Sequence, residues 1–272
     1  MKYKNIIRWF FMIICFLSTV SSVFAQADFH YRTRLLEPFV EMPFYNVSEN
    51  TSFYTSFVLD ELEKDSLIEN IVRDDTAQNR RYRVDIDDNN SVHMKFFIFS
   101  SIEDAEIHVL EYLSTSNVYP KHESQISANH NIGNNVWYGW NEKIVIFIRN
   151  NVEVRIVDNY SESDNNSVRI AKLVDSFLLQ KKTVSGSELV PVPKINSVTT
   201  VSSKVIGNSM QYKLNVEADD PLGQNLYYNI FGWSSENPFG NGVVTVSSGE
   251  QLDKTRIWIL NEDHFVSTVE HF

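Results

Sequence analysis

The alternation of apolar and polar residues is clearest between residues 80 and 158, where it predicts an antiparallel sheet. Residues 81–86 and 92–99 are β-type runs separated by Asp87-Asp88-Asn89-Asn90. Because Asn and Asp tolerate left-handed turn geometry, this segment predicts a hairpin. Three further β-type runs are separated by two-residue breaks, which predict a meander: residues 136–140, 143–149 and 152–157.

Two segments carry apolar residues at helical spacing. The segment Ser100-Ser101-Ile102-Glu103 places Ser and Glu three residues apart, which is the spacing of a capping box at the start of a helix. The apolar stripe that follows runs to Leu113, and in this interpretation His108 lies on the exposed side of the helix. A second stripe from Val168 to Leu178 predicts a helix that ends near Lys181.

The order of these elements predicts an α+β domain over residues 26–182, in which an antiparallel sheet carries two helices on one face. A composition change follows at Thr183, because residues 183–194 hold one Gly, two Ser and two Pro and lack a helical stripe; the linker is assigned to residues 183–192. This segment predicts a linker. Residues 193–272 read as short β-strands only, which predicts an all-β sandwich as a second domain.

One stretch of the second region resembles a known family. Val216-Glu217-Ala218-Asp219-Asp220-Pro221-Leu222-Gly223-Gln224-Asn225-Leu226-Tyr227-Tyr228 resembles the bacterial Ig-like and cadherin-like modules, which often show a strand, an Ala-x-Asp turn with Pro and Gly, and a Leu-x-Tyr strand. The resemblance covers about 80 residues. It implies a β-sandwich that serves as a spacer or adhesion unit.

The first 25 residues predict a cleavable secretory signal peptide. Basic residues lie within positions 2–8, the apolar run WFFMIICFL follows, and Val23-Phe24-Ala25 supplies a small residue at the cut site. The apolar run is about half the length that a membrane-spanning helix needs, although an uncleaved anchor is the alternative. We therefore expect a secreted or periplasmic protein without a stable membrane span after cleavage.

Cleavage also changes cysteine content and charge. Cys15, the single cysteine, lies within the predicted signal peptide, so thiol catalysis and cysteine-based metal sites are excluded for the mature chain. Removing Lys2, Lys4 and Arg8 changes the formal net charge from −11 to −14 (−11 minus 3). Because a chain this acidic repels phosphate backbones, nucleic acid is excluded as a partner.

Three clustered aromatic residues are the candidate binding site. Trp137, Tyr138 and Trp140 follow Asn134 and Asn135, and in a strand Trp137 faces the side opposite to Tyr138 and Trp140. Flat aromatic rings next to amides suit the binding of sugars or peptides. The alternative is that the rings are packing residues of the core and sheet surface.

Asp219 and Asp220 form the candidate metal site, for calcium. The resemblance implies this role, because cadherin-like modules bind calcium through acidic turns at domain junctions. The two acids are adjacent, however, instead of alternating as Asp-x-Asp. The alternative is a turn in which the Asp side chains accept hydrogen bonds from their own backbone. No other cofactor is expected.

No catalytic motif is found. The sequence lacks Gly-x-Ser-x-Gly, His-Glu-x-x-His and a phosphate-binding loop, whereas a carboxylate pair of the glycosidase type depends on distance in space. We therefore expect an exported, non-enzymatic protein that binds a protein or glycan of the cell envelope. The alternatives are an envelope hydrolase acting on glycans and a structural or assembly subunit that pairs through an edge strand.

Overall fold

The structure is a computed structural model, and the residues that it describes all lie in one compact unit, Phe44–Phe272. The described ranges are 54–55, 57–65, 67–74, 81–87, 90–115, 121–122, 130–139, 141–158, 166–184, 190–206, 209–230, 237–238, 243–248 and 256–270. The predicted signal peptide over residues 1–25 lies outside these residues.

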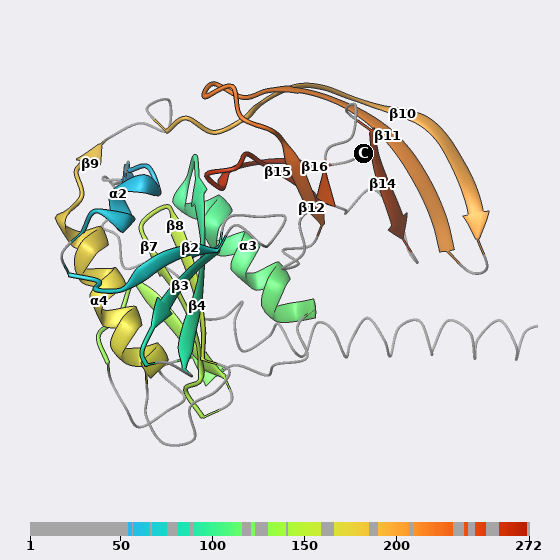
Figure 1. Ribbon diagram of the computed structural model, residues 1–272. Coiled ribbons are helices and arrows are strands. Elements are labelled where there is room, and N and C mark those ends of the chain that lie inside the picture. Colours follow the sequence, from blue (N-terminus) through green and yellow to red (C-terminus); the bar gives the residue numbers. More distant parts are fainter. Residues whose placement is uncertain are drawn as a thin grey trace, which may run out of the picture. The chain divides into compact units, whose positions relative to one another are not determined.

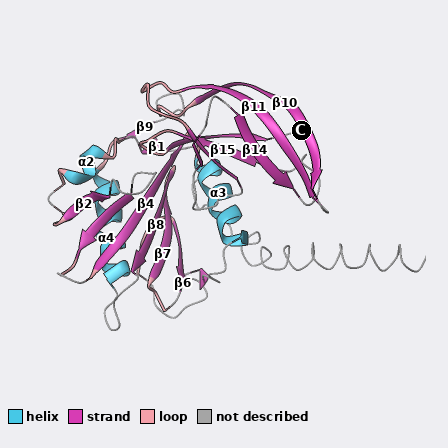
Figure 2. Cartoon of the chain, turned by 45° about the vertical axis from the view of Figure 1, so that its right-hand side comes forward, coloured by secondary structure: helices cyan, strands magenta, loops and turns pink. Residues whose placement is uncertain are grey.

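A sheet of 11 strands, counted over the described residues, organises this unit. Its main path runs β13-β12-β15-β16-β4-β8-β7-β6-β5, and β3 pairs with both β2 and β4 (Figures 1 and 2). The strands are β2 (Ile71–Asp74), β3 (Arg81–Asp85), β4 (Ser91–Phe99), β5 (Lys121–His122), β6 (Asn135–Gly139), β7 (Ile144–Arg149), β8 (Val152–Asp158), β12 (Tyr227–Ile230), β13 (Asn237–Pro238), β15 (Arg256–Leu260) and β16 (Phe265–Glu270).

Strand β4 joins the two sequence regions. Over Ser91–Met94 it pairs antiparallel with β3, and over Ile98–Phe99 it pairs parallel with β16. His264 has a positive φ of 58°, and its carbonyl accepts a hydrogen bond from the Ile98 amide at 2.9 Å. Its ring Nδ1 lies 2.7 Å from the Phe96 carbonyl oxygen. Strands on both sides of the predicted linker therefore hydrogen bond in one sheet.

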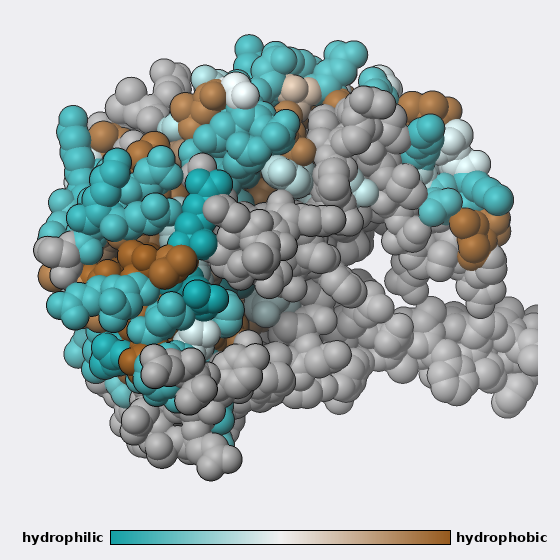
Figure 3. All heavy atoms as spheres, viewed as in Figure 1, coloured by the Kyte–Doolittle hydropathy of each residue, from teal (hydrophilic) through white to brown (hydrophobic). Residues whose placement is uncertain are grey.

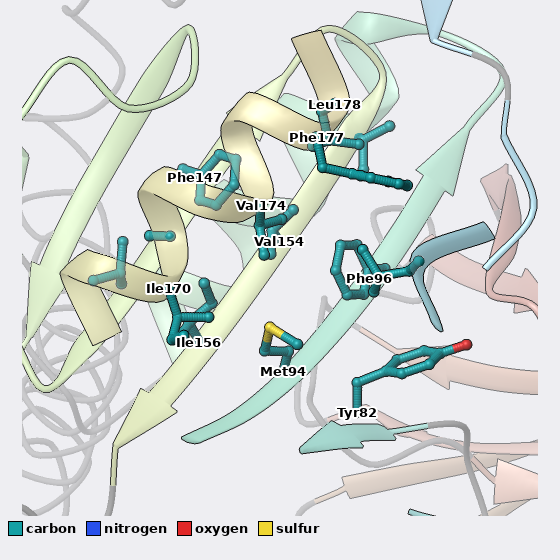
Figure 4. Packing of buried hydrophobic residues seen from close by; sticks show 14 of the residues in the cluster. Tyr82, Met94, Phe96, Phe147, Val154, Ile156, Ile170, Val174, Phe177 and Leu178 are labelled. Carbon is teal, nitrogen blue, oxygen red and sulfur yellow. The ribbon is translucent and has the colours of Figure 1, made fainter. Parts of the chain in front are cut away.

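Helix α4 (Asn166–Gln180) covers one face of this sheet. Alternate residues of β4 and β8, among them Phe96 and Val154, point toward α4 and pack against Val174 and Phe177 in a continuous apolar core (Figure 4). At the edge of this core, Arg149 binds Asp175 through two hydrogen bonds of 2.7 Å. The predicted apolar stripe of this helix is confirmed.

Helix α3 (Ile102–Thr115) lies on the opposite face of the sheet, so the prediction of both helices on one face is wrong. Its N-cap is Ser101, whose hydroxyl accepts a hydrogen bond from the Asp104 amide at 3.0 Å. The predicted cap is therefore shifted by one residue from the Ser100–Glu103 pair. Helix α2 (Asp60–Glu63) also lies in the predicted first domain, and β1 (Tyr54–Thr55) pairs with β9 (Thr183–Val184), whose two residues open the predicted linker.

A second, three-stranded sheet has the order β10-β11-β14. Its strands are β10 (Lys194–Ile206), β11 (Ser209–Asp219) and β14 (Val243–Ser248). It packs on the large sheet through Leu214 and Val216 of β11, which contact Ile257 and Ile259 of β15 in a small apolar cluster. Strand alternation places these β15 residues on the same face of the large sheet as the core beneath α4.

The expectation of a β-rich chain with few helices is confirmed. The predicted hairpin, the meander and its Asn141-Glu142 turn are also found, and both turn residues have a positive φ. The finer assignment of an α+β domain, a linker and an Ig-like sandwich stays a prediction. Among the residues that the structure describes, none of the helices has the length and apolar character needed to cross a membrane.

Candidate functional site

The predicted aromatic site lies on β6. Trp137 and Tyr138 are both buried, and Tyr138 belongs to the core beneath α4. Their rings therefore do not form a flat, solvent-facing surface, and their positions fit the packing alternative. Trp140 lies outside the described residues.

The predicted metal ligands belong to a network of hydrogen bonds at a turn. Asp220 accepts hydrogen bonds from the amides of Leu222 at 3.0 Å and Gln224 at 2.7 Å, and from the Asn261 side chain at 2.8 Å. Asp219 accepts one from the Asn196 side chain at 2.8 Å. These bonds match the turn alternative and connect the segment before β12 with the loop between β15 and β16.

A calcium ion at this turn would need oxygen ligands that converge on one point. The carboxylate oxygens of Asp220 instead face N–H donors. Over the described part of the chain, no group of three or more His, Cys, Asp or Glu side chains is placed to hold a metal ion. Calcium binding therefore stays a prediction.

A buried polar cluster lies beneath α3, and the prediction that His108 is exposed is wrong. His108 is fully buried, and its Nδ1 lies 2.6 Å from Oε2 of Glu153, which is also fully buried. Arg155 Nε donates to the other carboxylate oxygen of Glu153. Because Glu153 and Arg155 alternate on β8, both side chains point to the α3 face of the sheet.

The cluster extends into the C-terminal strands. Asn229 of β12 places its amide nitrogen 3.4 Å from His108 Nε2, and Trp258 of β15 meets the His108 ring edge to face at 4.9 Å. Because an ionised carboxylate only accepts hydrogen bonds, His108 Nδ1 carries a proton and donates to Glu153. Since Nδ1 then carries the proton, the nearby Arg155 nitrogen at 3.3 Å is a close contact and not a hydrogen bond.

Charge balance stabilises the cluster. Burial alone would raise the pKa of Glu153, but the charge of Arg155, the proximity of His108 and the hydrogen bonds from both lower that pKa below its usual 4.5. The Arg155 guanidinium also lies over the ring of Tyr112 at 3.7 Å. The cluster thus holds a carboxylate ionised in an apolar layer and links α3, β8 and the C-terminal strands.

The cluster does not carry substrate chemistry in this conformation, because the side chains of His108 and Glu153 have no exposed surface. A general acid or base must reach the proton that it transfers. The spacing of residues in α3 indicates that His108 is buried. His108 lies three residues after Ala105 and four before Tyr112, which places it in the sheet-facing stripe of the helix.

The candidate interaction surface is the hairpin formed by β10 and β11. All eight residues Thr199–Ile206 of β10 are exposed, on both faces of the strand. Three of them are large apolar residues: Val201, Val205 and Ile206 are 57%, 65% and 50% exposed. Apolar groups (brown) lie beside hydrophilic ones (teal) at the far end of β10 (Figure 3). The sequence predicted β-strands in this region, but no site was predicted there.

Strand β10 is also an edge strand. It pairs with β11 on one side, and no described strand pairs with its other side. The pairing with β11 has irregularities between Ile195 and Ser197 and between Thr200 and Ser202, whereas Ser202–Ile206 pair without a break. An edge strand presents unpaired N–H and C=O groups that can pair with another chain.

Comparison with known proteins does not assign this chain to a family. No protein-family model matches the chain, and no curated protein matches it either. Two solved structures of a Ruminococcus gnavus beta-glucuronidase, one in complex with uronic isofagomine, are 9% and 12% identical and each align with 82% of this chain. The alignments span 42% and 43% of the glucuronidase chains, with a TM-score of 0.22 for both.

Proposed function

We propose that this chain is an exported, non-enzymatic interaction protein of the cell envelope or extracellular space, and that the β10–β11 hairpin contacts its partner. The observation that carries this proposal is the exposure of Thr199–Ile206 along an edge strand. The predicted signal peptide supports export. The resemblance of residues 216–228 to Ig-like modules supports a role in adhesion or in presenting a binding element.

The surface chemistry of the hairpin suits a protein partner. Val201, Val205 and Ile206 are β-branched residues that contribute little to the core in their exposed positions. A partner that covered them would remove apolar surface from water and would also meet unpaired backbone groups. A surface of this kind favours protein contacts over sugar contacts, since sugar binding relies on flat aromatic rings.

We further propose that residues 193–272 form an Ig-like sandwich. The packing of β11 on β15 through Leu214, Val216, Ile257 and Ile259 supports two sheets that face each other. The hairpin then extends one sheet of this sandwich, which brings the edge of β10 to the surface. In this arrangement the large sheet supplies the rigid support for the binding element.

Site-specific photo-cross-linking in the producing cells tests the function. A benzophenone amino acid replaces Val205 in one variant of the full chain and Val72 in a second, because Val72 is also exposed but lies on β2. We expect a discrete cross-linked protein with the Val205 variant and none with the Val72 variant. Equal cross-linking of both variants, or no product from the Val205 variant, would contradict the proposal.

Export is tested separately. We expect the protein in the envelope or culture fraction to begin at Gln26, as measured by mass spectrometry of its N-terminal peptide. Recovery of the chain with residues 1–25 intact would overturn the expectation of signal cleavage.

A further inference from the structure

We infer that the partner adds an extended, acidic segment as a new strand along the free edge of β10. This inference rests on the proposed function and specifies the chemistry of the partner. It follows from two properties of the same edge, its regular backbone and its positive charge.

The backbone of β10 offers a short, regular edge. Ser202–Ile206 pair in continuous register with β11, from Ser202 opposite Lys213 to Ile206 opposite Ser209. These five residues span about 17 Å, the length of an average strand. Since no described strand occupies the far side of β10, one further strand fits there without displacing an existing pair.

The charge of the hairpin differs from that of the whole chain. From Lys194 to Val216 the sequence contains three lysines and no Asp or Glu, although the chain has a formal net charge of −11. Lys204 and Lys213 are exposed. Lys204 pairs with Gln211 and Lys213 pairs with Ser202, so strand alternation places both lysines on the same face of the hairpin. Acidic side chains on an added strand would lie opposite Lys204.

The same charge disfavours a second copy of this chain as the occupant. Pairing of two β10 edges would bring together two strands that each carry lysines and no acid. Lysine on an edge strand is a known means of preventing such self-association. The net negative charge of both copies adds a general repulsion. An acidic segment of a different protein would bring no second set of lysines to the edge and would not carry the net charge of a second copy.

Three synthetic peptides test the inference on the full exported chain. The first is a fluorescent Thr-Val-Glu-Val-Glu-Val-Thr peptide, the second has Lys in place of both Glu residues, and the third is the Glu peptide with all its backbone nitrogens methylated. Fluorescence anisotropy measures the affinity of each peptide. We expect the Glu peptide to bind about fivefold or more tightly than the Lys peptide, because opposite-charge pairs across strands stabilise and like-charge pairs destabilise.

The methylated peptide separates strand addition from simple charge attraction. Methylation removes backbone donors but leaves the carboxylates, so we expect it to abolish binding. Equal binding of the methylated and unmethylated Glu peptides would overturn strand addition. Equal binding of the Glu and Lys peptides, or no binding of any peptide, would overturn the acidic-strand inference.

Matched variants place the binding on β10. We expect K204E to weaken the Glu peptide about fivefold or more and to strengthen the Lys peptide. K172E makes the same change of charge at an exposed position of α4, and we expect it to leave both affinities within twofold. An equal effect of both variants would contradict binding at the hairpin.

The cross-linking experiment distinguishes this inference from the proposed function. Cross-linking at Val205 without preference for the Glu peptide would leave the interaction function standing and refute the acidic strand. Absence of cross-linking would refute the function itself. Dimers of the free protein in sedimentation experiments that K204E strengthens would identify a second copy as the occupant and overturn the inference.

Discussion

The two faces of the large sheet are built from the same strands but are stabilised by different interactions. Toward α4, alternate residues of β4 and β8 are apolar except Asp158 at the end of β8, and the core is held by packing. Toward α3, the same strands present Phe97, Glu153 and Arg155, and a charged network is enclosed among aromatic rings. One face is stabilised mainly by close packing, whereas the other encloses charges that must be paired.

The two faces of the large sheet therefore differ in how well they tolerate substitution. Apolar residues under α4 can exchange for others of similar volume at modest cost. The cluster under α3 accepts no such exchange, because removing one member leaves a buried charge uncompensated. It also brings Asn229 and Trp258 to α3, so it connects the C-terminal strands to that helix.

The largest expected loss of stability comes from the apolar face. Phe177 is fully buried and meets Phe57 edge to face at 5.5 Å. Phe177→Ala should lower the free energy of unfolding by about 3–5 kcal/mol at every pH, since a cavity does not titrate. Urea denaturation measures the change. Leu179→Ala on the exposed side of the same helix is the control and should cost less than about 0.5 kcal/mol.

A substitution on the α3 face should lower the free energy of unfolding by almost as much, but only at a pH at which Glu153 is ionised. Glu153→Gln should cost about 3 kcal/mol at pH 7, because it leaves the Arg155 charge without its partner. The folded-state pKa of Glu153 lies below 4.5, so its stabilising effect is present above pH 4.5 and fades as the pH falls through the lowered pKa. Urea titrations at several pH values should therefore show the two proteins converging in acid.

The control for Glu153→Gln is the same substitution at an exposed carboxylate. Glu63→Gln on the exposed surface of α2 should have little effect at any pH. A loss from Glu153→Gln that stays constant with pH would show that packing, and not the ionised carboxylate, makes the contribution.

A smaller effect of opposite sign is expected at Glu106 on α3. Burial, with a contribution from nearby Glu103, raises the pKa of Glu106 to about 8. The unfolded chain releases this proton near pH 4.5, so stability should fall as the pH rises from 4.5 to 8. Glu106→Gln should therefore stabilise the protein at pH 8 by about 1–2 kcal/mol, allowing for solvent screening, and have no effect at pH 4. Thermal unfolding at both pH values checks this.

The smallest effect on stability is expected at the hairpin. Val205→Ser should change the free energy of unfolding by less than about 0.5 kcal/mol, because this side chain is mostly exposed. It should nevertheless weaken capture of the cross-linked partner, measured with the photoreactive residue at Val201. A large loss of stability would show that Val205 serves the fold rather than binding.

Residues close in sequence determined much of the secondary structure. The runs 81–86 and 92–99 predicted β3 and β4, and the stripe from Val168 to Leu178 predicted α4. Predictions of this kind succeed because periodicity and turn residues act over a few positions. Glu153 and Arg155 alternate with apolar residues of β8, but the sequence analysis assigned no role to them.

The sites depended on contacts between distant residues. His108 meets Glu153 and Asn229, which are 45 and 121 positions away in sequence, and no local pattern specifies such partners. Trp137 is a second example. A local pattern predicted it as a binding residue, but it is buried in the sheet. Exposure is a property of the assembled layers, so the aromatic cluster and the hairpin could not be ranked in advance.

The sequence by itself determined many of the strands, the helices α3 and α4, and the acidic charge of the chain. Only the tertiary structure decided that α3 and α4 lie on opposite faces, that β16 pairs with β4, and that the edge of β10 stays exposed. The physical reason is that hydrophobic periodicity specifies which side of an element is buried, but not which other element buries it. That choice depends on the packing and hydrogen bonding of the whole chain.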